Sequence, residues 1–551
     1  MKKLILIIFS LCVAVMSQAL TVASTAGGLS TAITAAGGTL STVTNLTVTG
    51  TIDERDFATI HNSMSFLSVV NLSGVTIAAY TIYPANAIPD YAFEYCSSLT
   101  LVTIPSSVTS IGRNAFYECY SLTSITIPTT VTSIGTYAFY DCTSLKSVAI
   151  PSSVTSIGEG TFQDCVGLTT ISFAIPSSVT SIGVEAFQAC TGLTSITIPS
   201  SVTSIGAEAF YNCSGLITVD VNNPNYSSID GVLFNKAQTT LIQCPTSKTG
   251  SYAIPSSVTS IGEAALGYCT GLTSVSIPSS VTSIGTWAFS CCSGLTTISF
   301  AIPSSVTSIG SNAFYECYSL TSITIPTSVT SIGSSAFYEC TSLTSVAIPS
   351  SITSIEGQTF YYCVGLTSIT IPSSVTSIGG SALYECTGLK SITIPSSVTS
   401  IGDDAFDWCT GLTSIYADPT TPVALGSSTV FYNVDTTTCT LYVPTGSVSL
   451  YQTANQWKAF YNRTVGLAAG ISTNTIEAIT IYPNPVTDGF NISGLNGVSC
   501  VITIIDASGK TVLTKEITGN QYVAISELPQ GLYIVKIKTD NGTIEKKIIK
   551  K

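Results

Sequence analysis

Apolar positions recur along most of the chain in a pattern of about 23 residues. The segment from Leu193 to Cys213, LTSITIPSSVTSIGAEAFYNC, shows it, with about eight apolar positions separated mainly by Ser, Thr and Gly. The first apolar positions follow strand spacing, because alternate strand residues point to one face. Pro199 has no N–H for a sheet ladder and ends the strand, and Gly206 allows a sharp turn that a Cβ would hinder.

The remaining apolar positions of this unit predict how the coil closes. Val202 and Ile205 predict a second short extended segment. Ala209, Phe210 and Cys213 fall at helical spacing and are expected to close the coil from the far side. A single unit cannot bury so many apolar side chains alone, whereas stacked neighbours can. The pattern therefore predicts a repeat solenoid.

Two markers define the repeat. The dipeptide Ile-Pro recurs in steps of 23 or 25 residues with one step of 56, at Ile104, Ile127, Ile150, Ile175, Ile198, Ile254, Ile277, Ile302, Ile325, Ile348, Ile371 and Ile394. One cysteine per unit keeps the same period, at Cys96, Cys119, Cys142, Cys165, Cys190, Cys213, Cys269, Cys292, Cys317, Cys340, Cys363, Cys386 and Cys409. The long step predicts an insertion in a regular array.

The unit resembles the BspA-type leucine-rich repeat of bacterial surface and secreted proteins, over Tyr91 to about Leu412 in thirteen copies. The resemblance implies a right-handed coil with one parallel β-sheet wall. We expect an N-terminal capping region over 20–90, repeats over 91–415 and a C-terminal cap over 416–466. The insertion, about 219–251, is interpreted as a hairpin within the stack.

The first nineteen residues read as a signal peptide. Lys2 and Lys3 precede an apolar stretch too short for a comfortable membrane span, and cleavage is expected after Ala19. Cys12 could mark a lipoprotein, but that chemistry prefers a small residue where Leu11 stands. We therefore expect an exported chain, 20–551, with no transmembrane segment after signal cleavage.

Composition changes after a linker at 467–477. Residues 20–477 carry a net charge of −16, whereas 478–551 carry +2 and contain short alternating strands separated by turns, which predicts a small all-β sandwich. This module resembles the C-terminal sorting domain of the type IX (Por) secretion system of Bacteroidetes-type bacteria. The residues that carry the resemblance are Pro483, Asn484, Pro485, Gly531, Tyr533, Lys547 and Lys550. It implies export through the outer-membrane type IX machinery to the cell surface or the medium.

Charge and composition exclude several classes of function. The net charge of −12 and the pI of 4.5 oppose nucleic-acid binding, which needs a positive surface. His61 is the only histidine, so Ser-His-Asp, Cys-His and zinc-protease constellations are missing, and we expect no catalytic, cofactor or metal site. Weaker candidates are a phosphate loop at Gly509-Lys510-Thr511, calcium ligands around Asp220 to Asp230, and paired carboxylates among Asp403, Asp404 and Asp407. A hairpin turn, a broken loop spacing and a solvated acidic face explain these three better.

The eighteen cysteines leave two alternatives open. An exported protein normally forms disulfides, yet the thirteen repeat cysteines occupy inward sites and are odd in number. A buried ladder of unpaired thiols is the favoured interpretation. Cys291-Cys292 and the loop residues Cys244, Cys439 and Cys500 are the expected exceptions.

Outward strand positions are hydroxyls in coil after coil, and they form the candidate ligand-facing wall. These residues are Ser124, Thr126, Ser195, Thr197, Ser322, Thr324, Ser368, Thr370, Ser391 and Thr393. Such residues also suit an undemanding strand, so the alternative is a surface without function. A second candidate is a stripe of acids, often behind a tyrosine, directly before the repeat cysteine; its acids are Glu118, Asp141, Asp164, Glu316, Glu339 and Glu385.

These patterns favour a non-enzymatic, monomeric, secreted or cell-surface protein that binds an extended protein or polysaccharide through many weak hydrogen bonds. The alternative is a structural surface spacer without a specific ligand, and an enzyme is the least favoured class. The sequence does not identify the ligand, because near-identical coils hide which positions matter.

Overall fold

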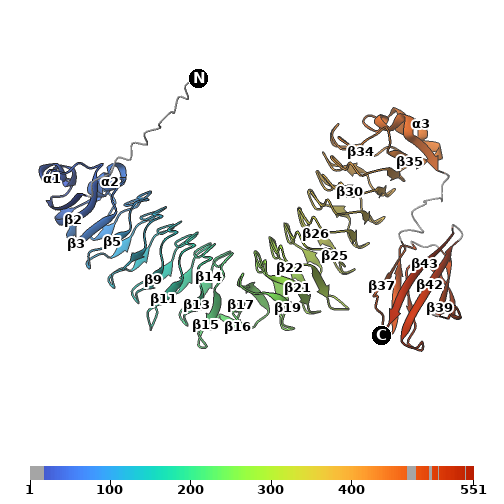
Figure 1. Cartoon of the computed structure of the whole chain (residues 1–551), viewed down its shortest axis with the longest axis horizontal. Helices are drawn as coiled ribbons and strands as arrows, with labels where there is room; N and C mark the ends of the chain where they lie inside the picture. Colours follow the sequence, from blue (N-terminus) through green and yellow to red (C-terminus); the bar gives the residue numbers. More distant parts are fainter. Residues whose placement is uncertain (1–17, 468–478, 496–498, 507, 540–541) are drawn as a thin grey trace, which may run out of the picture.

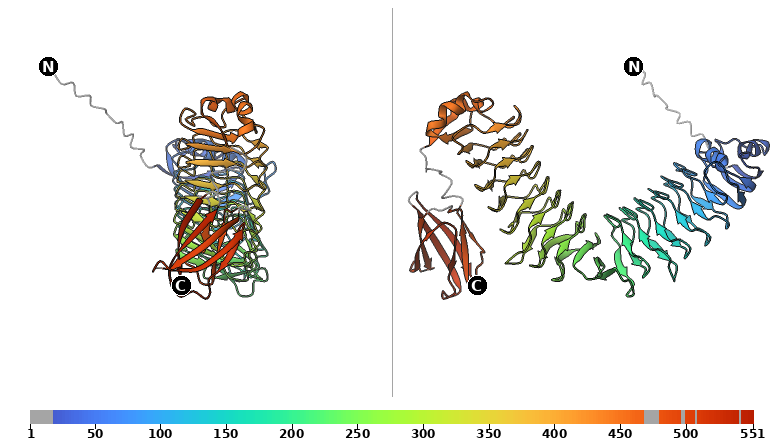
Figure 2. Two further views of the ribbon diagram at one scale, coloured as in Figure 1. Left: turned by 90° about the vertical axis from the view of Figure 1, so that its right-hand side faces the viewer. Right: turned by 180° about the vertical axis from the view of Figure 1, so that it is seen from behind.

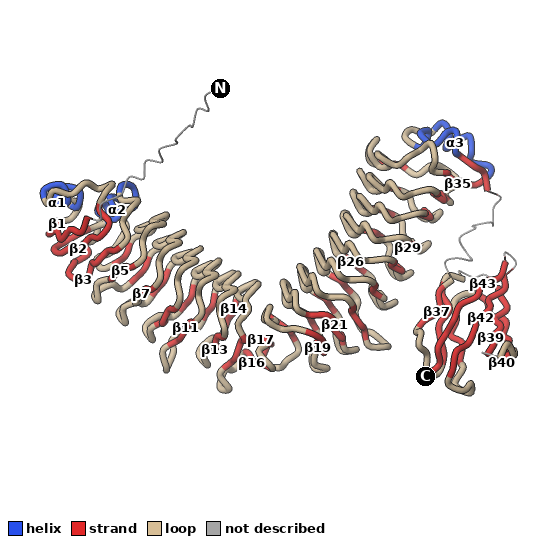
Figure 3. Tube along the Cα trace, viewed as in Figure 1, coloured by secondary structure: helices blue, strands red, loops and turns tan. Residues whose placement is uncertain are grey.

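The computed structural model describes residues 18–467, 479–495, 499–506, 508–539 and 542–551. Figures 1 and 2 show residues 18–467 as coils stacked side by side along an open arc. Figure 3 shows that most of each coil is loop and that strands occupy only short parts of it. The predicted solenoid is therefore confirmed. A separate all-β module follows it in the sequence.

One strand of each coil pairs in parallel with its counterpart in the next coil, and together these strands form the sheet wall. They are β5 (Leu101–Thr103), β7 (Ser124–Ile125), β9 (Ser147–Ile150), β11 (Thr170–Phe173), β13 (Ser195–Ile198), β15 (Leu216–Val219), β19 (Gly250–Ala253), β21 (Leu272–Ile277), β23 (Thr297–Phe300), β25 (Ser322–Ile323), β27 (Ser345–Ala347), β29 (Ser368–Thr370), β31 (Ser391–Ile394), β33 (Ser414–Ala417), β35 (Thr440–Pro444) and β36 (Thr464–Leu467). The wall is divided into four sheets and is interrupted between β15 and β19 by the insertion, so it is not one continuous sheet.

A second, narrower ladder runs along the stack after the proline of each coil. Its strands are two residues long: β4 (Ala87–Ile88), β6 (Ser110–Ile111), β8 (Ser133–Ile134), β10 (Ser156–Ile157), β12 (Ser181–Ile182), β14 (Ser204–Ile205), β20 (Ser260–Ile261), β22 (Ser283–Ile284), β24 (Ser308–Ile309), β26 (Ser331–Ile332), β28 (Ser354–Ile355), β30 (Ser377–Ile378), β32 (Ser400–Ile401) and β34 (Ala424–Leu425). The second extended segment predicted from Val202 and Ile205 is thus confirmed in every coil of this ladder.

The inward positions are those that the pattern predicts. In the unit Leu193 to Cys213, seven of the eight apolar side chains are no more than 2% exposed. Ile205 is only half-buried, because the insertion follows it and the next short strand is displaced. Its N–H donates instead to the hydroxyl of Tyr226, at 2.9 Å.

The closing segment of the coil is not helical, contrary to the prediction from Ala209, Phe210 and Cys213. We call this part of each coil the turn segment, with Arg113–Cys119 as an example. Two residues four apart, here Asn114 and Glu118, have φ near +55°, in the left-handed region. Alternate N–H groups consequently point to the next coil instead of back along a helix: Phe116 donates to the carbonyl of Ala138 and Glu118 to that of Tyr140, both at 2.8 Å.

Stacked phenylalanines fill the centre of the coils behind the turn segments. Phe93, Phe116 and Phe139 lie with ring centroids 5.0 and 5.1 Å apart and planes within 9° of parallel. The same arrangement continues from Phe289 through Phe314 in the second half of the array. Identical side chains can stack this way because every coil repeats the same register.

The insertion divides the apolar core into two clusters. It consists of β16 (Tyr226–Ile229), β17 (Val232–Asn235) and β18 (Thr240–Gln243), and β16 and β17 form the predicted antiparallel hairpin. β18 then pairs in parallel with β20 and restarts the narrow ladder. Leu233 belongs to the cluster of the preceding coils and Val232 to that of the following coils.

Irregular coils cover both ends of the array. At the N-terminal end, β1 (Gln18–Ser24), β2 (Val43–Ile52) and β3 (Val69–Ile77) extend the wall in parallel, with α1 (Leu29–Ala35) and α2 (Glu54–Ser63) beside them. At the other end lie η1 (Thr445–Ser447), α3 (Val448–Thr453) and η2 (Trp457–Arg463). Tyr451, Trp457 and Phe460 are buried there against the last coils and shield them from water.

The C-terminal module has two antiparallel sheets that share one apolar core. Its strands are β37 (Thr480–Tyr482), β38 (Gly489–Ser493), β39 (Ser499–Asp506), β40 (Thr511–Thr518), β41 (Gln521–Ala524), β42 (Gly531–Thr539) and β43 (Gly542–Lys550). This agrees with the predicted small sandwich.

All seventeen cysteines of the described residues are free thiols, including those expected to be exceptions; Cys12 lies outside these residues. A typical repeat thiol, Cys340, is fully buried, and its Sγ donates to the carbonyl of Phe314 in the preceding coil at 3.2 Å. Burial raises the pKa of Cys340 well above its usual value. The thiols therefore act as small apolar side chains with one weak donor that the neighbouring coil satisfies.

Replacing Gly333 by Ala is expected to destabilise the array. An added Cβ would lie 2.4 Å from the backbone nitrogen of Ser311 in the preceding coil, so the two coils would have to separate. We expect a loss of about 1–3 kcal/mol, visible as a lower urea midpoint. Gly446→Ala is the matched control, because a Cβ there meets nothing within 4 Å. An equal effect of both exchanges would contradict the close approach.

Native alkylation should distinguish the thiols. Cys291 is the one cysteine among the described residues that is not fully buried, and desolvation raises its pKa to about 11. Its reactive thiolate should therefore increase about tenfold for each pH unit from 7 to 9. Mass spectrometry after iodoacetamide treatment is expected to show one modified thiol in native protein and all of them after denaturation. Rapid labelling of Cys340, or a disulfide, would refute this assignment.

Candidate functional site

The structure places all ten candidate hydroxyl residues on the outer side of the sheet wall. Eight are exposed, and Ser391 and Thr393 are half-buried. The parallel register aligns them in two rows along the stack. One row contains Ser322, Ser345 and Ser368, which are direct neighbours in successive strands. Because strands in a sheet lie about 4.8 Å apart, each row presents hydroxyl groups at that interval.

Other serine and threonine columns of the array bond to the backbone of the solenoid itself. Thr194 and Thr344, each at the start of a wall strand, donate to carbonyls of the preceding coil at 3.2 Å. Thr330 does so beside the narrow ladder at 3.1 Å, and Ser328 donates to Val306 at 2.6 Å. These hydroxyls fasten each coil to the one before it. The high content of Ser and Thr therefore has a structural cause in these columns.

Most hydroxyls of the wall rows differ from those columns, although Ser299 and Thr218 donate to carbonyls of the preceding coil at 3.5 and 3.2 Å. Within the described residues, Ser195, Ser322 and Ser368 have no protein hydrogen-bond partner for their hydroxyl groups. Thr197 contacts the hydroxyl of Thr218 at 2.9 Å, which links two neighbours within the row. Most wall hydroxyls are consequently available to groups outside the chain. Sequence reasoning did not separate these two kinds of hydroxyl, although the bonded ones recur one coil apart.

The rows end at an aromatic pair near the C-terminal cap. In register, Thr393 is followed by Tyr416 and then by Tyr442, whose rings stack with centroids 4.7 Å apart. These half-buried rings extend the second hydroxyl row with two flat surfaces. The sequence pattern predicts these two tyrosines only as part of the C-terminal cap.

The acidic stripe occupies the second left-handed position of the turn segment. Glu118, Asp141 and Glu339 have φ of 54–55°, and their backbone N–H groups donate to the next coil. Burial, followed by the charge of Glu316, raises the pKa of Glu339. The acids therefore lie in a regular row on the turn segments and repel one another.

The remaining single-residue candidates have local structural partners. Nδ1 of His61 lies 2.7 Å from the carbonyl of Glu94. Asp407 accepts from the Nδ2 of Asn433 at 3.1 Å, and burial raises its pKa. Asp220 accepts from the N–H of Asn222 at 2.8 Å within the insertion. Gly509, at φ 86°, belongs to the turn between β39 and β40, which confirms the predicted hairpin.

The sorting-motif residues from the two ends of the C-terminal module meet in the structure. Nδ2 of Asn484 donates to the carbonyl of Lys547 at 2.8 Å, and its Oδ1 accepts from the N–H of Ile549 at 2.9 Å. The flanking Pro483 and Pro485 therefore lie beside the last strand, β43. Gly531 opens β42, and the hydroxyl of Tyr533 donates to the carbonyl of Pro529 at 2.8 Å.

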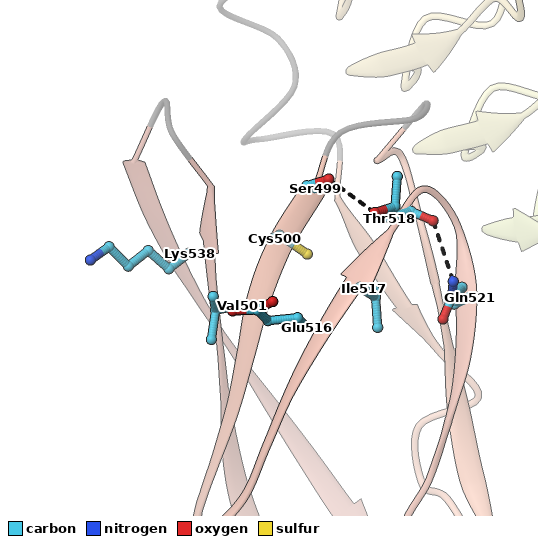
Figure 4. Close-up of a pocket in the computed structure, with 8 residues that line it drawn as sticks. All are labelled: Ser499, Cys500, Val501, Glu516, Ile517, Thr518, Gln521 and Lys538. Atoms are coloured by element: carbon cyan, nitrogen blue, oxygen red, sulfur yellow. Dashed lines mark hydrogen bonds between the residues drawn. The ribbon is translucent and has the colours of Figure 1, made fainter.

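The last strand is also fixed by a buried lysine. Nζ of Lys550 donates to the carbonyls of Ile525 and Ser526, each at 2.6 Å. A pocket of about 540 Å³ lies elsewhere in the module, beside Cys500, Glu516 and Lys538 (Figure 4). Ser499 and Thr518 close one side of it with a 2.9 Å contact between their hydroxyl groups. Its lining residues form no catalytic constellation.

The described residues contain no helix with the length and apolar character needed to cross a membrane. In the same part of the chain, no three His, Cys, Asp or Glu side chains gather in an arrangement suited to a metal ion.

Comparisons with known proteins agree with the geometry. The chain matches the family described as "BspA type Leucine rich repeat region (6 copies)" in overlapping segments from 59 to 454, and "Secretion system C-terminal sorting domain" over 480–551. A leucine-rich cell surface protein from Faecalibacterium prausnitzii is similar at 32% identity, covering 62% of this chain and 85% of that one, with a TM-score of 0.39. A leucine-rich repeat protein from Bacteroides ovatus is 29% identical, covering 65% and 88%, with a TM-score of 0.42. A search of curated proteins gave no match.

Neither family match is to an enzyme domain. The sorting domain implies interaction with the type IX secretion machinery and export to the cell surface or the medium. With stacked coils over most of its length, the chain belongs to the BspA-type leucine-rich repeat family and carries a C-terminal secretion sorting domain.

Proposed function

We propose that this protein is a non-enzymatic, monomeric adhesin whose sheet wall binds an extended protein or polysaccharide. The observation that carries the proposal is the difference between hydroxyl columns. Those beside the wall strands bond to the preceding coil, whereas Ser195, Ser322 and Ser368 face outward without a protein partner in the described chain. A repeating ligand could place one polar group against each coil.

Many weak contacts suit this surface better than one tight pocket. A single hydrogen bond contributes only about 0.5–1.5 kcal/mol after exchange with water. A row of them along one rigid array adds up, because binding at the first coil holds the ligand close to the next. No charged residue stands at the outward positions of the described wall strands. Recognition of the ligand would therefore depend on shape and hydrogen bonding.

The chemistry of the reactive side chains supports a non-enzymatic role. The imidazole of His61 is held against the carbonyl of Glu94, and burial raises the pKa of repeat thiols such as Cys340. A cysteine nucleophile needs an adjacent base or a lowered pKa, and the raised pKa of the buried thiols is the opposite of that.

The rival function is a structural spacer on the cell surface. The hydroxyls that bond from coil to coil favour it, because they give the Ser- and Thr-rich sequence a purely structural reason. Ordered, high-copy surface density without ligand affinity would favour the spacer over the adhesin.

Bulky side chains on the wall should weaken binding. The double variant Ser322→Trp, Thr324→Trp adds two large rings to exposed positions of one coil and would hold an extended ligand away from it. Using a binder identified on arrays of matrix proteins and polysaccharides, we expect at least tenfold weaker affinity, about 1.4 kcal/mol. Biolayer interferometry measures it.

Ser334→Trp is the control for that experiment, because Ser334 is exposed on the turn segment of the same coil, away from the wall strands. It should leave affinity unchanged. If no matrix protein or polysaccharide binds, or if both variants lose affinity equally, the wall is not the binding surface.

Removal of 478–551 should prevent surface display. Without the sorting domain the type IX machinery has nothing to recognise, so the truncated chain is expected to accumulate in the periplasm. Cell fractionation and protease accessibility of intact cells report the location. The control is the surface amount of the full-length chain, measured in the same way. Normal display of the truncated chain would refute the sorting role.

A further inference from the structure

One position of the turn segments holds a column of tyrosines in several successive coils, with a break at Gln163 and Gln188 and a second break at Gly267 and Ser290. The column position lies between the buried Phe and the second left-handed residue. In the second half of the array, Tyr315, Tyr338, Tyr361 and Tyr384 stack there with centroids 4.6–4.7 Å apart and planes within 13° of parallel. Parallel stacking at this distance covers the ring faces of each tyrosine with its neighbours.

The second break directly follows the insertion. The two coils that follow it have Gly267 and Ser290 at the column position. The ring of Tyr211, from the last coil before the insertion, occupies the space: a Cβ on Gly267 would lie 2.3 Å from its Cε2. The hydroxyl of Tyr211 reaches Ser290, with 3.1 Å between the oxygens. Two small residues thus let one tyrosine span a coil instead of stacking.

A pocket opens beside this tyrosine. It has a volume of about 500 Å³ and is lined by Tyr211, Tyr268, Trp287 and Tyr315, together with Glu208, Cys291 and Glu316. We call it the junction pocket. Tyr268 and Trp287 stand at left-handed positions of their coils, which elsewhere hold various residues, including acids, Asn, Ser and the aromatic Tyr91, Tyr137, Tyr362 and Trp408. What distinguishes this place is that Tyr211 meets Tyr268 while Trp287 meets Tyr315, so that four rings line one pocket.

The ring contacts within the junction pocket are inclined, although Tyr315 also stacks on Tyr338 as the first ring of the column. Tyr211 and Tyr268 have centroids 5.3 Å apart at 74°, and Trp287 and Tyr315 have centroids 5.1 Å apart at 60°. Inclined rings do not cover one another's faces as parallel rings do. The negative face of an aromatic ring attracts a cation within about 6 Å of its centroid, most strongly for Trp.

The charged side chains around the junction pocket are negative, like the faces of its aromatic rings. Glu208 and Glu316 line the junction pocket, and no lysine or arginine does. In the described chain, both ion pairs lie elsewhere, at Arg55–Asp53 and Lys536–Glu545. Burial, and then the charges of Glu185 and Glu263, raise the pKa of Glu208. The carboxylates thus form a negative field that no cationic side chain neutralises.

We propose that the junction pocket binds a quaternary ammonium group, held by cation–π contacts with its four rings and by attraction to its two carboxylates. Methyl groups on nitrogen match this lining, because they spread the charge over an apolar surface. A choline head group and a trimethylated lysine side chain share this chemistry. A phosphate next to the ammonium would meet the carboxylates, so free choline should bind more tightly than phosphocholine. The site is separate from the sheet wall and does not depend on the proposed adhesin function.

The test uses the intact exported chain and isothermal titration calorimetry with choline, phosphocholine, a trimethyl-lysine peptide and 3,3-dimethyl-1-butanol. The last compound is the neutral isostere of choline. We expect saturable choline binding at least tenfold tighter than that of the isostere. Tighter binding of the peptide would assign the site to a protein ligand, and tighter binding of choline to a free or carbohydrate-linked head group. Equal affinity for choline and its isostere, or no binding of either cation, would overturn the proposal.

Matched variants separate the pocket from the fold. Trp287→Gln removes one ring, and the same left-handed position holds Gln358 in another coil, so the fold accommodates the exchange. We expect at least a tenfold loss of choline affinity. Trp408→Gln is the control, because Trp408 is 44% exposed at a left-handed position outside the junction pocket. Binding that survives Trp287→Gln, or that Trp408→Gln weakens equally, would refute the site.

Discussion

Hydrogen bonding between successive coils is the constraint on which the whole array depends. Each coil is about 23 residues long, too short to bury its own apolar side chains, and only a fixed register with its neighbours encloses them. Three backbone ladders impose that register: the wall strands, the two-residue strands and the left-handed turns. Hydroxyls such as that of Thr330 and thiols such as that of Cys340 add side-chain bonds to the same neighbour. The stacked phenylalanines and tyrosines follow from this register.

The sequence predicts the inside of the coil well and its closing turn poorly. Leu193, Ile196 and Val202 are buried as expected, because spacing and hydrophobicity alone determine which side of a strand faces the core. The prediction of a helical turn segment is wrong, because the helical spacing of Ala209, Phe210 and Cys213 also fits a segment with two left-handed residues. Left-handed residues are normally signalled by Gly or Asn, whereas this chain uses residues such as Glu118 and Trp287. The neighbouring coil supplies the hydrogen bonds that offset the strain.

The junction pocket lies beyond any local pattern. Tyr211 and Ser290 are 79 residues apart and meet because Gly267, in the coil between them, leaves room for the tyrosine ring. In the sequence, Gly267 is simply a glycine where some other coils have tyrosine. The structure shows that a Cβ there would clash with the ring of Tyr211. The hydroxyl residues show the same difficulty. Ser322 and Ser328 are the same residue type in one coil, and only the fold shows that Ser322 faces outward and Ser328 bonds to the carbonyl of Val306.

The uniform register also determines how such a chain can change in length. Because Ser322, Ser345 and Ser368 occupy equivalent places in consecutive coils, loss or gain of one whole coil joins surfaces that already fit. Near-identical units also favour slippage and unequal recombination of the coding sequence. The length of the array can therefore change by whole coils without loss of folding. Coils next to the insertion are not interchangeable in this way, so the segment around Gly267 should persist while the arms on either side lengthen or shorten.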